Sequence, residues 1–277
     1  MHPYASRVSP RVRTSSVRPS DHGKWDAIKD VLDHGKGYVI LRGFPVAGRP
    51  EADIAAEFEA LMRRLGTVTG HGASGQKVWR IAPRPDLDHV PTFSEAAGEA
   101  PFHTDNSWAP EPERYFALLV IRPADVGGES LACPVAELLD EFARTREGAA
   151  AVRTLSENLF PFAMPVIFRG HTERAASVTP VLTSRVVLSH SAMRYRHDVL
   201  KAGFQVRPDL ATPENVRAVE VFNEFLTGVR RTYPTVRLES GDLLIANNYT
   251  VLHARTDFTD PNRLLLRARI ALPASRN

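Results

Sequence analysis

The residue types best suited to chemistry lie in one short stretch, Pro-Phe-His-Thr-Asp-Asn-Ser-Trp at positions 101–108. His103 and Asp105 are two residues apart, and in an extended segment this spacing directs both side chains to the same face. An imidazole and a carboxylate on one face supply two ligands of a 2-His-1-carboxylate metal site, which keeps coordination positions open for a reaction. The stretch therefore predicts part of a catalytic metal centre that needs a second histidine from elsewhere in the chain.

The later histidines are few, and one of them occupies a position that suits the missing ligand. They are His171, His190, His197 and His253. Within residues 241–255, a Gly-Asp turn, an apolar run and a polar bend precede a second apolar run that carries His253, which predicts two consecutive strands. The second strand would bring its imidazole into the mouth of a β-barrel, whereas His190 and His197 are interpreted as structural.

An arginine-rich strand is predicted after this histidine. Residues 263–269 read Arg-Leu-Leu-Leu-Arg-Ala-Arg, and the two-residue period of a strand places Arg263, Arg267 and Arg269 on one face. The other face then carries the apolar residues Leu264, Leu266 and Ala268. A buried guanidinium without an anionic partner is costly, and a carboxylate held by two parallel hydrogen bonds is its natural partner. This strand therefore predicts a binding site for a carboxylate.

The elements that must position these residues are many short strands and a few helices. Apolar and β-branched runs predict strands, and caps with 3.6-residue periodicity predict helices. Because the order does not alternate strand with helix, we predict a mainly β fold with flanking helices, a β-sandwich or jelly roll, over a parallel α/β sheet. The strands are predicted over 38–41, 78–82, 115–121, 130–133, 160–162, 166–168, 178–182, 186–188, 236–239, 243–246 and 264–272, and the helices over 21–34, 51–65, 136–142 and 213–231.

Composition is that of an ordinary globular chain of 277 residues, with 43% hydrophobic and 24% charged residues. No apolar run approaches the roughly 20 residues needed to cross a bilayer. The N-terminus lacks the apolar core of a signal peptide, and the single cysteine, Cys133, fits a reducing compartment. We therefore expect a cytoplasmic protein without a membrane partner; a homo-oligomer is compatible with the sequence.

The net charge of +3 belongs to the beginning of the chain. Arg7, Arg11, Arg13 and Arg18 lie in the first twenty residues, which contain no acid, and the remaining 31 of the 35 basic residues nearly balance the 32 acidic ones. This distribution predicts a flexible basic tail over 1–19 and a single, nearly neutral domain over 20–277. A nucleic-acid partner is not expected of such a domain.

A glycine-rich segment, Gly-His-Gly-Ala-Ser-Gly at 70–75, satisfies the G-x-G-x-x-G pattern of dinucleotide-binding loops. That pattern binds a pyrophosphate only where a strand precedes it and the N-terminus of a helix follows it. Here a helix is predicted before the segment and a strand after it, so we do not interpret it as a cofactor loop. The chain also lacks the G-x-S-x-G and G-x-x-x-x-G-K-[ST] patterns of hydrolases and phosphate-binding loops.

Taken in order, these motifs resemble those of the Fe(II)/2-oxoglutarate-dependent dioxygenases of the taurine dioxygenase type, a family that includes the similarly sized carbapenem synthase. The resemblance covers the His-x-Asp motif at His103 and Asp105, the distal His253, the downstream Arg267, and a Gly-Gly-x-Ser motif that ends at Ser130. It implies a double-stranded β-helix, a cupin-like jelly roll, with the metal at its mouth. The three metal ligands would be His103, Asp105 and His253.

The resemblance also implies Fe(II) as cofactor, and 2-oxoglutarate and O2 as co-substrates. In the family, a serine or threonine at the Ser130 position and the downstream arginine hold the far carboxylate of 2-oxoglutarate. Arg267 matches the family position of that arginine, and Arg263 is its competitor for the role. The implied reaction is oxidation of a C–H bond of a small molecule, by hydroxylation, desaturation or ring closure, and a role in specialised metabolism fits the carbapenem synthase-like motif layout.

Basic residues near the predicted site favour a carboxylate- or amino-acid-like substrate. The candidate substrate contacts are His71, Asn106, Trp108, Arg194 and Arg255. Two alternatives remain at this point. One is a non-catalytic, cupin-like module that binds a metal or a ligand, which would have no need of a carboxylate-binding arginine and serine. The other is a nucleic-acid demethylase of the same superfamily, against which the nearly neutral domain argues.

Overall fold

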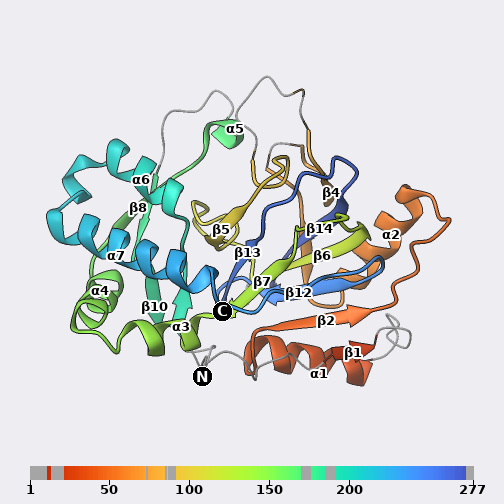
Figure 1. Ribbon diagram of the computed structural model, residues 1–277, viewed down its shortest axis with the longest axis horizontal. Helices are drawn as coiled ribbons and strands as arrows, with labels where there is room; N and C mark the ends of the chain where they lie inside the picture. The colour runs from red at the N-terminus through yellow and green to blue at the C-terminus, as the bar shows by residue number, and fades with distance from the viewer. Residues whose placement is uncertain are drawn as a thin grey trace.

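The computed structural model describes residues 11–13, 22–72, 74–84, 86, 92–169, 176–184 and 191–272, and its centre consists of two sheets that face each other (Figure 1). The larger sheet has the strand order β1-β2-β12-β6-β14-β3, and β4 also pairs with β14; the smaller sheet has the order β5-β13-β7. The bounds in the larger sheet are β1 (Arg11–Arg13), β2 (Tyr38–Arg42), β12 (Leu243–Asn247), β6 (Tyr115–Arg122), β14 (Leu264–Ala271), β3 (Thr67–Thr69) and β4 (Val78–Ile81). Those in the smaller sheet are β5 (Ala100–His103), β13 (Val251–Arg255) and β7 (Ser130–Pro134).

Apolar side chains fill the space between the two sheets. Phe116, Leu244 and Leu265 of the larger sheet meet Ala132 and Val251 of the smaller one in this layer. All pairings within the two sheets are antiparallel, except that of β1 with β2. The predicted fold class, a mainly β jelly roll with flanking helices, is therefore confirmed.

Alternation along each strand divides its residues between this layer and an outer one. On the outer face of the larger sheet, Leu266, Ala268 and Ile270 of β14 pack with the helices α1 (His22–Asp33) and α2 (Glu51–Met62). The arginines between these apolar residues consequently point into the space between the sheets, as the two-residue period predicts. The fold thus buries the arginine face of β14 at the centre of the molecule.

A second outer layer covers the smaller sheet, to the left in Figure 1. Leu131, Cys133, Leu252 and Ala254 contribute to this apolar cluster, the largest in the described part of the chain. The other elements of the chain, most of which pack in this layer, are α3 (Val135–Phe142), α4 (Arg146–Glu157), α5 (Val166–Arg169), α6 (His197–Val206), α7 (Pro213–Arg230), β8 (Phe160–Ala163), β9 (Ala176–Thr179), β10 (Leu182–Ser184), β11 (Ser191–Met193) and the 3-10 helix η1 (Pro208–Leu210).

The long helix α7 begins as predicted, because the Thr212 side chain accepts a hydrogen bond from the Asn215 backbone at 3.2 Å and Pro213 follows the cap.

Several predicted elements differ from the structure. Residues 166–168 were predicted as a strand, but they form the short helix α5, so their β-branched and aromatic composition did not decide the local structure. Residues 236–239 form no strand, and Val236 makes only an isolated bridge with Ser130. The helices α4 and α6 are additional to the predicted set. The strand predicted over 186–188 lies outside the described residues, as does most of the tail over 1–19.

The glycine-rich segment at 70–75 connects β3 to β4, which both pair with β14. The His71 backbone N–H donates to the Gln76 carbonyl at 2.8 Å, and that of Gly75 donates to the His71 carbonyl at 2.7 Å, so the described residues of the segment form a compact loop between strands. The strand β3 before the loop was not predicted, but β4 after it was. Because β4 follows the loop directly, no helix N-terminus is available there to bind a pyrophosphate.

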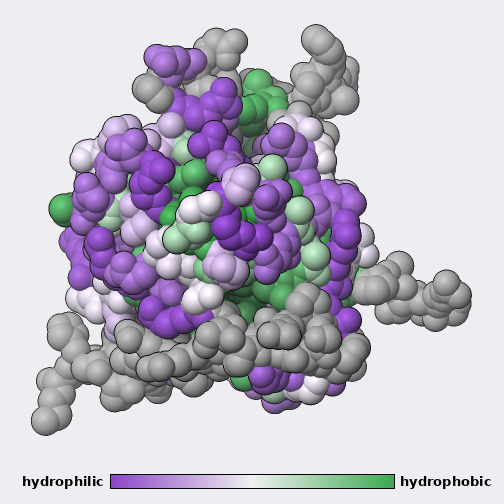
Figure 2. Space-filling model, turned by 90° about the vertical axis from the view of Figure 1, so that its right-hand side faces the viewer, coloured by the Kyte–Doolittle hydropathy of each residue, from purple (hydrophilic) through white to green (hydrophobic). Residues whose placement is uncertain are grey.

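Over the stretches that the structure describes, no helix combines the length and the hydrophobicity needed to cross a membrane. Figure 2 shows the side of the molecule that lies to the right in Figure 1, and its described surface is mainly hydrophilic with hydrophobic residues gathered towards its middle. The larger hydrophobic side chains that are exposed, such as Val126 and Val166, lie in different parts of the chain.

Candidate active site

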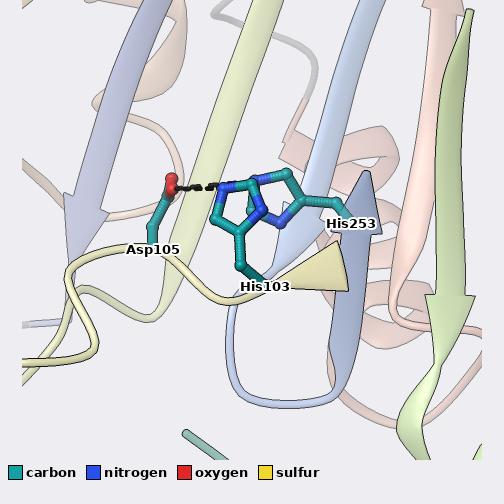
Figure 3. A group of neighbouring side chains, drawn as sticks. All are labelled: His103, Asp105 and His253. Carbon is teal, nitrogen blue, oxygen red and sulfur yellow. Dashed lines mark ion pairs between the residues drawn. The ribbon is translucent and has the colours of Figure 1, made fainter. Parts of the chain in front are cut away.

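His103 and His253 meet because their strands pair in register. β5 and β13 are antiparallel neighbours in the smaller sheet, with His103 directly opposite His253, and the two ring centroids are 4.1 Å apart. Asp105 lies two residues beyond the end of β5, and its Oδ1 is 3.8 Å from His103 Nε2 and 3.6 Å from His253 Nε2. In Figure 3 the two imidazoles and the carboxylate point toward one another.

The three predicted ligands are buried and held by neighbouring groups. The His103 Nδ1–H donates to the Pro101 carbonyl at 2.8 Å. In the neutral ring, Nε2 then carries the lone pair that can bind a metal. The Asn248 side chain accepts from the Asp105 backbone N–H at 2.7 Å and donates to the Asp105 carbonyl at 3.0 Å. This pair of hydrogen bonds fixes the turn that carries the carboxylate.

The protonation states suit metal binding. Burial lowers the pKa of His103 to about 4 and lowers the pKa of His253 well below its ordinary value, so both rings are neutral at neutral pH. Burial acts to raise the pKa of Asp105, but nearby positive charge, above all the Arg267 guanidinium, outweighs it and holds this pKa below its usual range. Two neutral imidazoles and an ionised carboxylate are the forms that bind a metal.

The donor set therefore fits an Fe(II) ion. One ligand atom from each of His103, Asp105 and His253 lies within 4.8 Å of the others, and all three side chains are buried. The His253 Nδ1 has no hydrogen-bond partner among the described residues. Two imidazoles and one carboxylate form the facial ligand set of non-haem iron oxygenases, which leaves other positions around the metal open.

A cavity extends from the triad toward the beginning of β7. His103, His253 and Arg267 line the end at the triad, and the polar side chains of Ser130, Arg255 and Arg263 lie among those that line the remainder. Burial lowers the pKa of Arg263 to about 9, and its guanidinium makes no ion pair with any acid in the described part of the chain. Its Nη1 is buried without a hydrogen-bond partner among the same residues, although its carbon lies 4.8 Å from the centre of the Phe258 ring. A buried cation of this kind requires an anion.

The adjacent Gly-Gly segment accommodates this arginine. Gly127 and Gly128 have φ values of 74° and 70°, a backbone region that glycine adopts without strain. A side chain on Gly128 would place its Cβ 3.1 Å from Arg263 Nε, and one on Gly127 would clash with the Asp257 carbonyl. The two glycines therefore let the loop before Ser130 approach the guanidinium closely.

Arg267 lies nearer the metal ligands than Arg263 does. Its Nη2 donates to Asp105 Oδ2 in a short, buried hydrogen bond and is 3.3 Å from His253 Nε2. Its Nε has no partner among the described groups. Arg263, just before β14, and Arg267, within it, therefore serve different ends of the site, with Arg267 at the triad and Arg263 at Ser130.

A second pocket opens on the other side of Asp105, and its walls are largely aromatic. Trp108 and Phe168 stack with ring centroids 5.1 Å apart, and His71 lies 4.9 Å from Trp79 and 5.5 Å from Phe168. The polar side chains that complete its lining are those of Thr92, Ser94, Asn106, Arg196, Arg267 and Arg269. Such a pocket suits a small molecule with a polar group at one end.

The structure brings three of the five predicted substrate contacts, namely His71, Asn106 and Trp108, to this second pocket. Arg194 is not among the residues that line it, because its guanidinium donates to the carbonyls of Ala109 at 2.8 Å and Pro110 at 3.1 Å. The neighbouring Arg196 lines the pocket instead.

Sequence reasoning missed Arg196, and also Arg269, as pocket residues. Arg196 lies over the rings of Phe93 at 4.4 Å and Trp108 at 5.5 Å and pairs with Asp198 at 2.8 Å. The signals that could have found them were the basic cluster at 194–197 and the position of Arg269 on the arginine face of the predicted strand.

Arg255 lines the first cavity, but its guanidinium mainly holds a loop in place. It donates to the carbonyls of Phe93 at 3.0 Å, Ala96 at 3.0 Å and Gly98 at 2.9 Å. That loop carries the Phe93 ring to within 4.9 Å of the His103 ring. Arg255 therefore positions one wall of the metal site.

We expect Arg255→Met to lower the free energy of unfolding by about 2–4 kcal/mol, because it leaves several carbonyls without donors. Arg237→Met is the matched control, since Arg237 also donates to two loop carbonyls, those of Ala124 and Asp125, but its side chain is 43% exposed. The control is expected to lose less than about 1 kcal/mol in urea denaturation. Equal losses in the two variants would contradict the role given to Arg255.

Known proteins that are similar to this chain provide evidence about its family and fold that does not depend on the geometry of the site. The family model described as taurine catabolism dioxygenase TauD, TfdA family matches residues 3–269. A crystal structure of asparagine oxygenase in complex with Fe(II), a hydroxyasparagine and succinate superposes with a TM-score of 0.71 at 21% sequence identity, covering 92% of this chain and 86% of that one. The non-haem iron oxygenase OrfP in complex with Fe and α-ketoglutaric acid superposes with a TM-score of 0.63 at 17% identity, covering 92% of this chain and 81% of that one. At these identities, the two structures show a shared fold.

Proposed function

The chain belongs to the TauD, TfdA family of dioxygenases, and from this premise we propose that it is an Fe(II)- and 2-oxoglutarate-dependent oxygenase that oxidises a C–H bond of an amino-acid-like substrate. The observation that carries the proposal is the buried His103–Asp105–His253 triad between two cavities, one of which ends at an unpaired cation. When bound, Fe(II) with 2-oxoglutarate activates O2, so that one oxygen atom enters the substrate while 2-oxoglutarate is converted to succinate and CO2.

The triad would hold the metal, and the surrounding residues keep it in its ligating form. Pro101 orients His103 through Nδ1, and Asn248 fixes the backbone of Asp105. The rings of Phe93 and Phe116 pack against His103 and His253, at 4.9 Å and 4.2 Å between centroids, and exclude water from the ligands. A water-poor surrounding strengthens the electrostatic interactions of a bound metal.

We assign the far carboxylate of 2-oxoglutarate to Arg263 and Ser130. Arg267 was preferred on sequence because it matches the family position, but its guanidinium is paired with Asp105 beside the metal ligands. Arg263 and Arg267 both line the cavity that contains Ser130, but Arg263 has no acidic partner in the described residues. The dicarboxylate would then extend along the cavity, with its 2-oxo acid end at the triad and its other end at Arg263.

The substrate would occupy the second pocket, and two features support an amino-acid-like molecule. Arg196, Arg267 and Arg269 supply donors for a carboxylate, and the aromatic rings supply an apolar wall. The structurally similar asparagine oxygenase was crystallised with 3-hydroxyasparagine, and OrfP with a 3-hydroxyarginine. A non-catalytic, cupin-like module, the alternative considered from sequence, would have no use for a buried arginine that lacks an anion.

We further propose that residues 20–277 act as one cytoplasmic domain on a small-molecule substrate, without a nucleic-acid or membrane partner. Three observations support this proposal. The flanking helices and both sheets share continuous apolar layers, the net charge outside the tail is close to zero, and the single Cys133 is buried and unpaired. Cells in which the chain is expressed with a fluorescent tag would show its location directly.

An anaerobic titration tests the proposed function. Adding Fe(II) and then 2-oxoglutarate to the metal-free protein is expected to produce the visible charge-transfer band of the metal–2-oxoglutarate chelate. In air, the same protein is expected to convert 2-oxoglutarate to succinate faster when L-asparagine, L-arginine or another amino acid is added. Absence of the band, with Fe(II) left unbound, would favour the non-catalytic module.

A further inference from the structure

A buried carboxylate that is not a predicted metal ligand lies beside the second pocket. Glu113 is 8% exposed and precedes β6. It accepts hydrogen bonds from Thr69 Oγ1 at 2.9 Å and Asn106 Nδ2 at 3.0 Å, and its Oε2 is 3.5 Å from Arg269 Nη1. One carboxylate thus connects β3, the turn after Asp105 and the arginine face of β14.

The first residue that Glu113 holds toward the pocket is Asn106. Its φ is 52°, and it is the sole non-glycine residue with positive φ in the described ranges. This region of backbone conformation is unfavourable for most side chains and is tolerated best by glycine and asparagine. The Asn106 amide donates Nδ2–H to the Glu113 carboxylate, and no donor among the described residues is hydrogen-bonded to its Oδ1.

The second residue held by Glu113 is Arg269. Its guanidinium is buried, lies 5.0 Å from the centre of the Trp79 ring and lines the pocket. Its Nε has no hydrogen-bond partner within the described part of the chain, and the same is true of Arg267 Nε. Arg267 is two residues earlier on the same face of β14, so both arginines retain donors for an additional acceptor.

The charges around the pocket are balanced pair by pair. Arg269 faces Glu113, Arg196 pairs with Asp198 at 2.8 Å, and Arg267 pairs with Asp105. A pocket with both donors and acceptors but little net charge is complementary to a head group that carries one positive and one negative charge. A ligand with two negative charges would form hydrogen bonds only with the donors of this pocket.

We propose that Glu113 positions Asn106 and Arg269 as an anchor for the ammonium–carboxylate head of a free α-amino acid. Asn106 Oδ1 accepts a hydrogen bond from the ammonium, and Arg269 donates to the carboxylate. The inference rests on the proposed function and specifies the substrate class of the same site. The aromatic walls formed by Trp108 and Phe168 then receive the amino-acid side chain.

The first test uses the anaerobic protein loaded with Fe(II) and 2-oxoglutarate. Each proteinogenic α-amino acid is added in turn, and a perturbation of the visible charge-transfer band reports binding beside the metal. At least one free amino acid is expected to perturb the band, and its N-acetyl and carboxamide derivatives are each expected to bind at least about tenfold more weakly, because each loses one charge of the head group. A band that forms but responds to no amino acid would overturn the anchor, whereas failure of the band itself would overturn the proposed function.

Variants of the network then test the positioning role. Asn106→Gly removes the amide without straining the backbone, and Glu113→Gln leaves Arg269 without its carboxylate; each is expected to raise the dissociation constant of the amino acid at least about tenfold. The dissociation constant of 2-oxoglutarate, which binds in the other cavity, is expected to stay unchanged in both variants.

Thr69→Val is the matched control, because it also removes one hydrogen bond to Glu113 but lies outside the pocket lining. Its amino-acid affinity is expected to stay within about twofold of that of the unmodified protein, whatever its cost in stability. A Thr69→Val variant that binds the amino acid as weakly as Asn106→Gly does would show that Glu113 has only a structural role. Retention of full affinity by Asn106→Gly would equally overturn the proposal.

Discussion

His253→Ala is expected to weaken Fe(II) binding by at least about a hundredfold and to abolish amino-acid-dependent turnover of 2-oxoglutarate. The substitution removes one of three protein ligands, and loss of residues that merely support metal ligands already costs about 10–100-fold. His253 is buried at the centre of the triad, 3.6 Å from Asp105, and no other described histidine joins the triad. Anaerobic titration with Fe(II), followed by the charge-transfer band, measures the loss.

His197→Ala is the control for this prediction. His197 contacts Glu220 at 3.2 Å at the start of α6, and its side chain is 23% exposed. Its replacement is expected to leave the Fe(II) affinity and the charge-transfer band unchanged. Undiminished Fe(II) binding by His253→Ala, or an equal loss in His197→Ala, would remove His253 from the ligand set.

Arg263→Met is expected to raise the dissociation constant of 2-oxoglutarate on the order of a hundredfold while Fe(II) binding stays unchanged. A bidentate hydrogen bond between a guanidinium and a carboxylate is among the strongest in proteins, and each hydrogen bond to a charged group contributes about 1.5–3 kcal/mol. Methionine preserves much of the length of the side chain and its contact with Phe258 but provides no donor. Titration of 2-oxoglutarate into the anaerobic Fe(II) protein gives the dissociation constant.

The same substitution is not expected to lower the stability of the ligand-free protein. Burial lowers the pKa of Arg263 to about 9, because the cation has no acidic partner in the described structure and Arg255 lies nearby. Replacing a buried, unpaired charge by an apolar side chain removes a desolvation cost. Urea denaturation of the two proteins without 2-oxoglutarate is therefore expected to give a free energy of unfolding for Arg263→Met at least equal to that of the unmodified protein.

Arg267→Met separates the two candidates for the far carboxylate. Arg267 pairs with Asp105, so its loss is expected to disturb the metal ligands and to reduce Fe(II) affinity. If Arg267→Met specifically weakened 2-oxoglutarate binding and Arg263→Met did not, Arg267 would be the residue that binds the far carboxylate, as its family position indicates. The assignment of that carboxylate to Arg263 would then be wrong.

Local patterns in the sequence determined which side chains are available and which face of each element they occupy. The arginine face of residues 263–269 follows from the two-residue period of a strand, and the structure has it. Asp105 lies in the turn after β5, so its carboxylate reaches His103 through that turn and not through the period of a strand. The start of α7 follows from Thr212 and Pro213, because capping is a matter of adjacent residues. The jelly-roll class follows from the order of short strands, and the combination of motifs indicates the family.

The tertiary structure alone decided which of these side chains meet, because register between strands depends on partners far apart in the chain. The pairing of β5 with β13 places His103 opposite His253, and no local pattern specifies that register. Arg263 lies just before β14 and lines a cavity with Ser130, whereas Arg267, four residues further along, pairs with Asp105, so the position along this segment decides which group each arginine meets. Glu113 has no motif around it, and only the folded arrangement of β3, β6 and β14 makes it the carboxylate beside the pocket. The period of a strand is local, whereas position within a barrel is set by every strand that closes it.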